Sequence, residues 1–115
     1  MMKMNVIPST GMKVSAVGLG CEHLQGMDEE SIKKVVDAAL ACGINIFDVF
    51  MSEPQVRSNI GKALAGRRDQ VFLQGHIGAA WIDGQYARIR DAARCQIFFE
   101  DFLERYQTDW LDIGF

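Results

Sequence analysis

Short apolar runs alternate along this chain with stretches whose apolar residues recur at helical spacing, which indicates an α/β fold. The apolar runs cover residues 16–20, 44–49 and 71–75, and a further run occupies 110–115. Each of these runs reads as a strand, and a helix is predicted between each pair of them. Repeated strand-helix units of this kind form a parallel sheet, and the strands follow one another in sequence order where the order never reverses, as in half of a barrel.

The first two predicted helices carry signals at both ends. Asp28 precedes Glu29-Glu30, which predicts an N-cap followed by acids in the first turn, and Gly43 stands where this helix would stop. The second helix is predicted to begin near Pro54 and to end at Gly66. The residues expected on the buried faces are Ile32, Val35, Val36, Ala39 and Leu40 in the first helix, and Val56, Ile60, Ala63 and Leu64 in the second.

The remaining segments, before the first strand and after the third, have a less regular pattern of apolar residues. Residues 77–84 read as a loop, and a long helix is expected over 86–106. Its buried face would comprise Ile89, Ala93, Ile97, Phe98, Phe102 and Leu103. Two β-prone runs around a glycine-containing turn predict a hairpin over residues 6–15. No linker or low-complexity segment is visible, so residues 1–115 are expected to form one domain.

Composition narrows the function classes. The formal net charge of -3 provides no basic surface for nucleic acid. No apolar stretch approaches the roughly 20 residues that a membrane span needs. The three cysteines, Cys21, Cys42 and Cys95, are odd in number and widely spaced, so neither a disulfide framework nor a cysteine metal site is indicated. We therefore expect a cytoplasmic protein without nucleic-acid or membrane partners.

Four sequential parallel strands would leave one face of the sheet bare. Crossover connections of one hand place all the helices on the same face, and the opposite face and both edges then need another partner. Such a chain is expected to form a homodimer through the uncovered sheet, to aggregate, or to be the N-terminal part of a longer protein. A non-catalytic module that self-associates or binds a partner is therefore one functional hypothesis.

Polar residues follow three of the predicted strands. Glu22 and His23 come after the first, Asp48 ends the second, and His76 follows the third. Because carboxyl ends of parallel strands meet at one edge, these side chains form a candidate site there. Asp48 is read either as a catalytic carboxylate or as a cap of nearby N–H groups, and His76 either as a partner of Asp48 or as a structural histidine.

The same edge suggests two further chemistries. His23, Asp48 and His76 resemble the ligand list of a metal site, which would make the protein a metal-dependent lyase or hydrolase. Cys21 adjoins the same edge and is read as a reactive thiol or as small packing material.

Four segments resemble the aldo/keto reductases, which are (β/α)8 TIM barrels that reduce carbonyls with NADPH. They are GMKVSAVGLG at 11–20, AALACGINIFD at 38–48, IGKAL at 60–64 and FLERYQTDWLD at 102–112. Residues 20–26 and 74–78 look most like the branch whose longer members carry a ferredoxin-like iron-sulfur segment. The resemblance implies the N-terminal part of the barrel: an opening hairpin, about three βα units and a fourth strand.

The resemblance also implies an NADP-dependent oxidoreductase acting on a small-molecule carbonyl substrate. Asp48 matches the aspartate of the family's catalytic Asp, Tyr, Lys and His. The tyrosine should follow about five residues later, where 49–53 contains none, and His76 stands where the lysine is expected. The family's histidine and its phosphate-binding loops would lie beyond Phe115. In the interpretation in which it replaces the lysine, His76 would pair with Asp48 and act as an acid or polarise the substrate, and the interpretation of His76 as a structural histidine stays open beside it.

Overall fold

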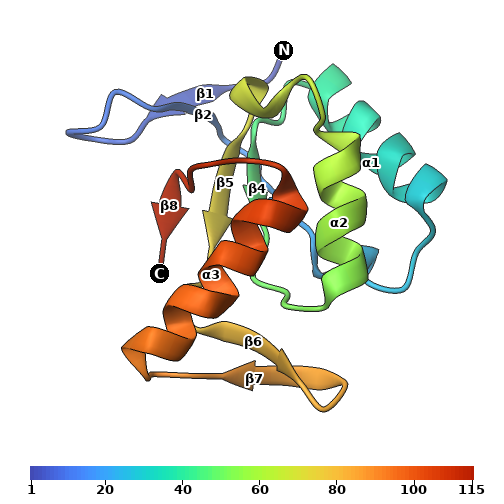
Figure 1. Cartoon of the computed structure of the whole chain (residues 1–115). Helices are drawn as coiled ribbons and strands as arrows, with labels where there is room; N and C mark the ends of the chain where they lie inside the picture. Colours follow the sequence, from blue (N-terminus) through green and yellow to red (C-terminus); the bar gives the residue numbers. More distant parts are fainter.

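The computed structural model describes residues 1–115 and contains a four-stranded parallel sheet (Figure 1). Its strands are β3 (Leu19–Gly20), β4 (Ile46–Asp48), β5 (Phe72–Gly75) and β8 (Ile113–Gly114). They lie in the order β3-β4-β5-β8, and each neighbouring pair is parallel. The predicted α/β fold with sequential parallel strands is confirmed.

Three helices lie side by side along one face of this sheet (Figure 1). They are α1 (Glu29–Ala41), α2 (Pro54–Ala63) and α3 (Ala92–Tyr106), and two short 3-10 helices occupy Glu22–Leu24 and Arg68–Gln70. The outward strand side chains Phe47, Val49 and Leu73 are completely buried beneath them. No helix covers the opposite face. None of the helices is long and apolar enough to cross a lipid bilayer.

The first two helices begin and end close to where their signals predicted. Asp28 caps α1 by accepting a hydrogen bond from the Ser31 N–H at 2.7 Å, and Gly43 adopts φ +84° just past the helix end. The predicted buried residues of both helices lie in the core or pack against it. Glu53, which the sequence did not single out, caps α2 through bonds from Gln55 N–H at 3.0 Å and Val56 N–H at 2.6 Å.

The predicted loop over 77–84 is wrong. The chain forms an antiparallel hairpin of β6 (Ala79–Ile82) and β7 (Gln85–Arg88), which lies at the carboxyl ends of β4 and β5 beside the start of α3 (Figure 1). Its two-residue turn is Asp83-Gly84, with φ of 53° and 74°. Positive φ at both central positions defines the tight hairpin turn that Asp-Gly favours. This signal was present in the sequence.

The third helix is shorter than predicted, because β7 takes up residues 85–88 and Asp91 caps the helix through the Arg94 N–H. The predicted buried face is wrong at its beginning: Ile97 is 62% exposed, and Ala93 is exposed as well. The face that packs on the core contains Phe99, Phe102, Leu103 and Tyr106. Ile97 lies five residues before Phe102, and this spacing puts it on a different side of the helix.

The hairpin predicted at 6–15 is confirmed as β1 (Met4–Val6) paired with β2 (Lys13–Ser15). Asn45, just before β4, fastens it to the sheet. Its Oδ1 accepts from Ser15 N–H at 2.8 Å, and its Nδ2 donates to the Lys13 carbonyl at 3.0 Å. The strand predicted at 44–49 is shorter in the structure, where β4 covers Ile46–Asp48.

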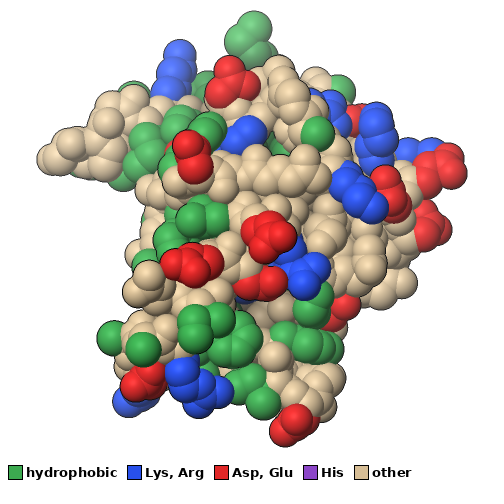
Figure 2. Space-filling model, viewed as in Figure 1, with side chains coloured by type: hydrophobic (Ala, Val, Ile, Leu, Met, Phe, Trp, Pro, Cys, Tyr) green, Lys and Arg blue, Asp and Glu red, His purple; other side chains and the backbone are tan.

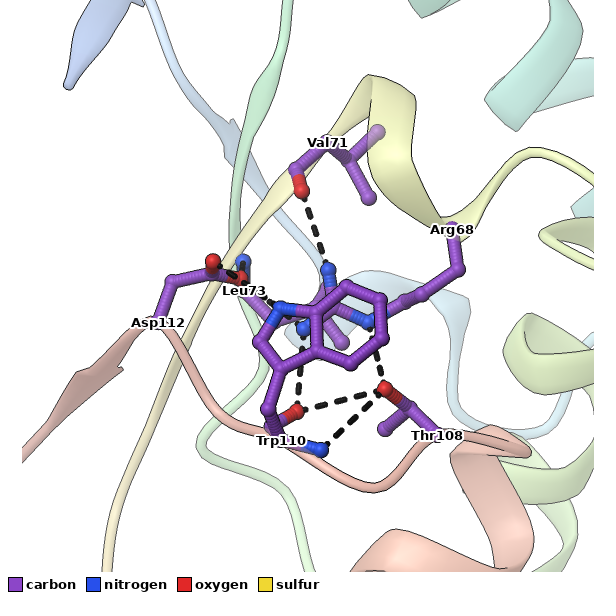
Figure 3. Close-up of polar contacts among 6 residues, drawn as sticks. All are labelled: Arg68, Val71, Leu73, Thr108, Trp110 and Asp112. Carbon is purple, nitrogen blue, oxygen red and sulfur yellow. Dashed lines mark hydrogen bonds and ion pairs between the residues drawn. The ribbon is translucent and has the colours of Figure 1, made fainter.

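Arg68 connects the end of the second strand-helix unit to the last strand (Figure 3). Its guanidinium donates to Asp112 Oδ2 at 2.8 Å, to the Val71 and Trp110 carbonyls at 3.0 Å each, and to Thr108 Oγ1 at 2.9 Å. The guanidinium carbon also lies 4.2 Å from the centre of the Trp110 ring. Asp112 Oδ2 in turn accepts from Leu73 N–H on β5 at 2.9 Å. The buried ion pair thus holds β5 and β8 together.

Arg68→Ala is expected to lower the free energy of unfolding by about 3–5 kcal/mol, because it leaves the buried Asp112 carboxylate without its cation. Urea denaturation followed by circular dichroism measures this loss. Arg94→Ala serves as the matched control, since Arg94 is exposed and makes no ion pair, and it should stay within about 0.5 kcal/mol of the unchanged chain. Equal stability of the two variants would contradict the role assigned to Arg68.

Candidate functional site at the carboxyl edge of the sheet

The uncovered face of the sheet carries polar side chains in neighbouring strands. Asp48 on β4 lies in register with Gln74 on β5, and alternate residues of a strand point to the same face. The next position outward on each strand therefore brings Phe50 beside His76. The His76 ring lies 5.7 Å from the Phe50 ring and 5.3 Å from that of Phe115, which follows β8. This uncovered side is called the inner face below.

Asp48 is half-buried, and its Oδ1 is buried without a hydrogen-bond partner. No loop N–H donates to its side chain, so the capping interpretation does not describe this residue. The expected pairing with His76 is also wrong, since the structure contains no ion pair between them. The register explains this: Gln74 is the residue opposite Asp48, and His76 lies two residues further along the chain, past the end of β5.

A cavity of about 420 Å³ lies beside Asp48 on the inner face. Its wall includes Gly18 and Gly20 of the β3 segment as well as Ile46 and Gln74. A Cβ atom added to Gly20 would meet nothing within 4 Å, so the backbone there borders open space. The arrangement leaves an unsatisfied carboxylate oxygen beside an open, mostly uncharged wall.

His76 lines a second cavity, of about 370 Å³, between the strand ends and the β6–β7 hairpin. The hairpin contributes Tyr86 and Arg88, and the segment after it contributes Arg90. The hairpin is fastened to the loop after β4, because the Ser52 hydroxyl donates to the Ala80 carbonyl at 2.5 Å. The cavity is therefore built by chain segments that the sequence prediction assigned to a loop and a helix.

The two tyrosines of the chain occupy different sides of the molecule. Tyr106 is buried among the helices, where burial raises the pKa of its unpartnered phenol. Tyr86 lies on β7 with its ring 6.0 Å from Phe50, and it lines the His76 cavity. Sequence reasoning missed Tyr86 as a site residue because the Asp83-Gly84 turn signal was not used.

The proposed metal ligands are not brought together. His23 has a side chain that is 91% exposed and lies 3.5 Å from Glu22, its neighbour in the sequence. The structure contains no group of three or more His, Cys, Asp or Glu side chains that could hold a metal ion. The candidate set of His23, Asp48 and His76 does not form a site in this structure.

Cys21 is buried and acts as packing material in the core. Burial, assisted by the negative charge of Asp48, raises the pKa of its thiol from 9.0 to about 12. A thiolate is the reactive form of cysteine, so this environment works against reactivity. The interpretation as small packing material is supported over the reactive thiol.

Comparison with known proteins relates the chain to one enzyme family. No protein-family model matches it. The chain is 32% identical over 121 residues to the aldo-keto reductase YhdN of Bacillus subtilis, an alignment that covers 97% of this chain and 37% of the relative. The chain thus spans little more than a third of that protein's length.

Solved structures agree with this similarity. The holo form of the aldo-keto reductase AKR11C1 from Bacillus halodurans superimposes with a TM-score of 0.86 and 29% identity, covering 99% of this chain and 39% of that structure. An aldo-keto reductase from Klebsiella pneumoniae in complex with NADPH matches in fold, with a TM-score of 0.74, 22% identity and coverage of 99% and 39%. The expected fold, part of an aldo/keto reductase barrel, is confirmed.

The raised pKa of Cys21 predicts slow alkylation. At pH 8 its thiolate fraction should be about a thousandfold smaller than that of an exposed thiol with a pKa of 9.0. Iodoacetamide labelling followed by peptide mass spectrometry should therefore show the exposed Cys42 reacting far ahead of Cys21, and the difference should vanish in urea.

The same pKa shift has a consequence for stability. The unfolded chain releases the Cys21 proton above pH 9 while the folded chain keeps it, so the free energy of unfolding should decrease as the pH rises from about 9 toward 12. Replacing Cys21 with Ala should weaken this alkaline decrease. Rapid native labelling of Cys21 at pH 8 would contradict both expectations.

Proposed function

We propose that this chain, whose similarity to aldo-keto reductases extends over nearly its whole length, is the opening part of an NADP-dependent oxidoreductase of that family. The substrate would be a small-molecule carbonyl compound. The observation that carries the proposal is the unpartnered Asp48 carboxylate on the inner face, where an open cavity lies beside it. The remaining part of the barrel would come from chain outside these residues, since the match covers 37% of YhdN.

The cavity beside Asp48 fits one end of the cofactor. Its glycine-lined wall leaves room for a flat ring, and Asp48, which lines the cavity, provides a carboxylate that could accept a hydrogen bond from a carboxamide NH₂. No Lys or Arg lines this cavity, so nothing there suits the phosphates. We infer that Asp48 and its neighbours would hold the nicotinamide end, and that the phosphates would bind to other parts of a longer protein.

When bound, NADPH supplies the hydride that reduces a carbonyl carbon. The chain's own contribution is the proton and the surroundings of the reacting group. His76 is placed at the strand end, where its imidazole donates a proton to the substrate oxygen or polarises it. Phe50 and Phe115 provide aromatic surfaces beside this ring. The family's missing tyrosine and lysine would thus be replaced by a histidine.

The proposal includes two more specific assignments, the branch of the family and the location in the cell. The branch with an iron-sulfur segment is one of them, and the cluster would need cysteines outside this chain, since Cys21, Cys42 and Cys95 are all free and form no ligand group. A cytoplasmic location is the other, for which three unpaired thiols are the supporting feature.

The inner face also favours a second candidate function. Ile46, Phe72 and Ile113 lie on the inner face and are only half-buried, so this face has an apolar surface to cover. A second copy of the chain would cover it in a self-associating module without catalytic activity.

The reductase proposal predicts that His76→Gln lowers kcat/KM by a factor of about 10² or more, because it removes the proton donor. Asp48→Asn should weaken cofactor binding or turnover while leaving the fold intact. NADPH oxidation by the longer protein that contains this chain, followed at 340 nm with a panel of small aldehydes and ketones, measures both effects. Full activity of the His76 variant would contradict the proposal.

The oligomeric state separates the two candidates. Light scattering of the purified 115-residue chain, with an NADPH titration on the same sample, is the measurement. If the chain is an incomplete barrel, it should form a polydisperse aggregate that does not bind NADPH. A well-defined dimer of twice 12.9 kDa that binds no cofactor would support the self-associating module instead.

A further inference from the structure

The β6–β7 hairpin and the residues that follow it contribute two arginines, Arg88 and Arg90, to the lining of the His76 cavity. Tyr86, Arg88 and Arg90 alternate along β7 and its extension, so their side chains point to one side of the strand. The Ile89 N–H donates to the Gly78 carbonyl at 2.9 Å, which continues the ladder beyond β7 and fixes this alternation. All three side chains line the cavity together with His76.

The positive charge at this cavity is not balanced within the chain. No Asp or Glu lines the cavity, and neither Arg88 nor Arg90 forms an ion pair or a side-chain hydrogen bond. Many charges elsewhere are paired, among them Lys33–Asp37 and Lys62–Glu29 on the helices, and Figure 2 shows acidic and basic side chains side by side over α1 and α2. In a chain of net charge -3, two free guanidiniums facing one cavity provide a local site for an anion.

The carboxylate nearest to the two arginines in the sequence, that of Asp91, already accepts a hydrogen bond elsewhere. Asp91 follows Arg90 directly, but its Oδ1 accepts a hydrogen bond from the Arg94 N–H at 2.9 Å as the cap of α3, and it does not line the cavity. The guanidiniums therefore keep their donors for a ligand. Each presents a planar set of N–H groups that matches the paired oxygens of a carboxylate or a phosphate.

The rest of the cavity suits a small organic molecule. Its volume of about 370 Å³ is within the range of small-molecule sites. Ile77, Ile89 and Phe115 supply apolar contacts, and His76 supplies a polar group at the same cavity. A ligand held by its anionic end at the guanidiniums would extend along these apolar side chains toward His76.

We propose that the cavity between His76 and the β6–β7 hairpin binds the anionic group of a small carbonyl substrate, with Arg88 and Arg90 as the ligands of a carboxylate or a phosphate. This assignment of substrate class rests on the proposed reductase function. The anion site itself depends only on the hairpin and its charges, so binding can be tested without turnover.

Arginine-specific labelling with phenylglyoxal, read by peptide mass spectrometry, tests the site in the protein that contains this chain. Two matched probe pairs differ in charge: pyruvate with hydroxyacetone, and dihydroxyacetone phosphate with dihydroxyacetone. We expect one charged probe of these pairs to slow labelling of Arg88 and Arg90 in a saturable manner, while its uncharged counterpart does not. The pair that responds identifies the anion as a carboxylate or a phosphate.

Arg94 is the internal control, because it is exposed but does not line the cavity. Its labelling should not change with any probe. Absence of protection by both charged probes, or equal protection of Arg94, would overturn the proposal. Protection by the uncharged compounds to the same extent would overturn it as well.

Equilibrium dialysis with the protecting anion gives a second measurement. The double variant Arg88→Gln/Arg90→Gln should bind it at least about tenfold more weakly, whereas Arg94→Gln should bind it normally. Unchanged affinity of the double variant would overturn the proposal. Protection of the arginines by an anion without any NADPH oxidation would contradict the reductase function and support the anion site. NADPH oxidation without protection would support the reductase function and contradict the anion site.

Discussion

The buried pair of Arg68 and Asp112 is the contact on which the last part of the sheet depends. β8 contains only two residues, and its backbone alone makes few bonds to β5. Asp112 adds a bond to Leu73 N–H, and Arg68 holds this carboxylate and the preceding turn at the same time. Lysine has too few donors in fixed directions to replace it. Through this pair, β8 is kept beside β5 and Phe115 is kept beside His76.

The two faces of the sheet have different surroundings, and this difference determines on which face polar side chains can contact a ligand. On the helix side, Phe47 and Leu73 are fully buried, and Cys21 and Tyr106 in the same core both have their pKa raised by burial. On the inner face, Asp48 and His76 are only half-buried and no helix lies over them. The inner face is thus both the uncovered face of the sheet and the face with polar groups free to meet a ligand.

Local signals were sufficient to predict much of the fold. The caps of α1, the glycine that ends it and the helical spacing of its apolar residues act within a few positions, so α1 was predicted almost completely. Asp83-Gly84 is also a local signal, and it predicts a tight hairpin turn. Because the prediction did not use it, the predicted start of α3 was too early, and Tyr86, Arg88 and Arg90 were not recognised as site residues.

Other features depend on register or on distant contacts. Asp48 and His76 were correctly placed at the carboxyl edge, but their pairing depended on which residue of β5 lies opposite Asp48, and that residue is Gln74. Arg68 was not singled out because Asp112 lies 44 positions away in the sequence. Nothing in the local pattern distinguishes Arg68 from the neighbouring Arg67.

Hydrogen exchange of the backbone amides in the unchanged chain and in Arg68→Ala tests most directly whether this ion pair organises the site. Three bonds report on the β5–β8 contact: Phe115 N–H to the Gly75 carbonyl, Ile77 N–H to the Phe115 carbonyl, and Leu73 N–H to Asp112. We expect their amides to lose more protection in the variant than Val49 N–H, which bonds Gln74 between β4 and β5 and reports only the general loss of stability. Unchanged protection of the three amides would contradict the account.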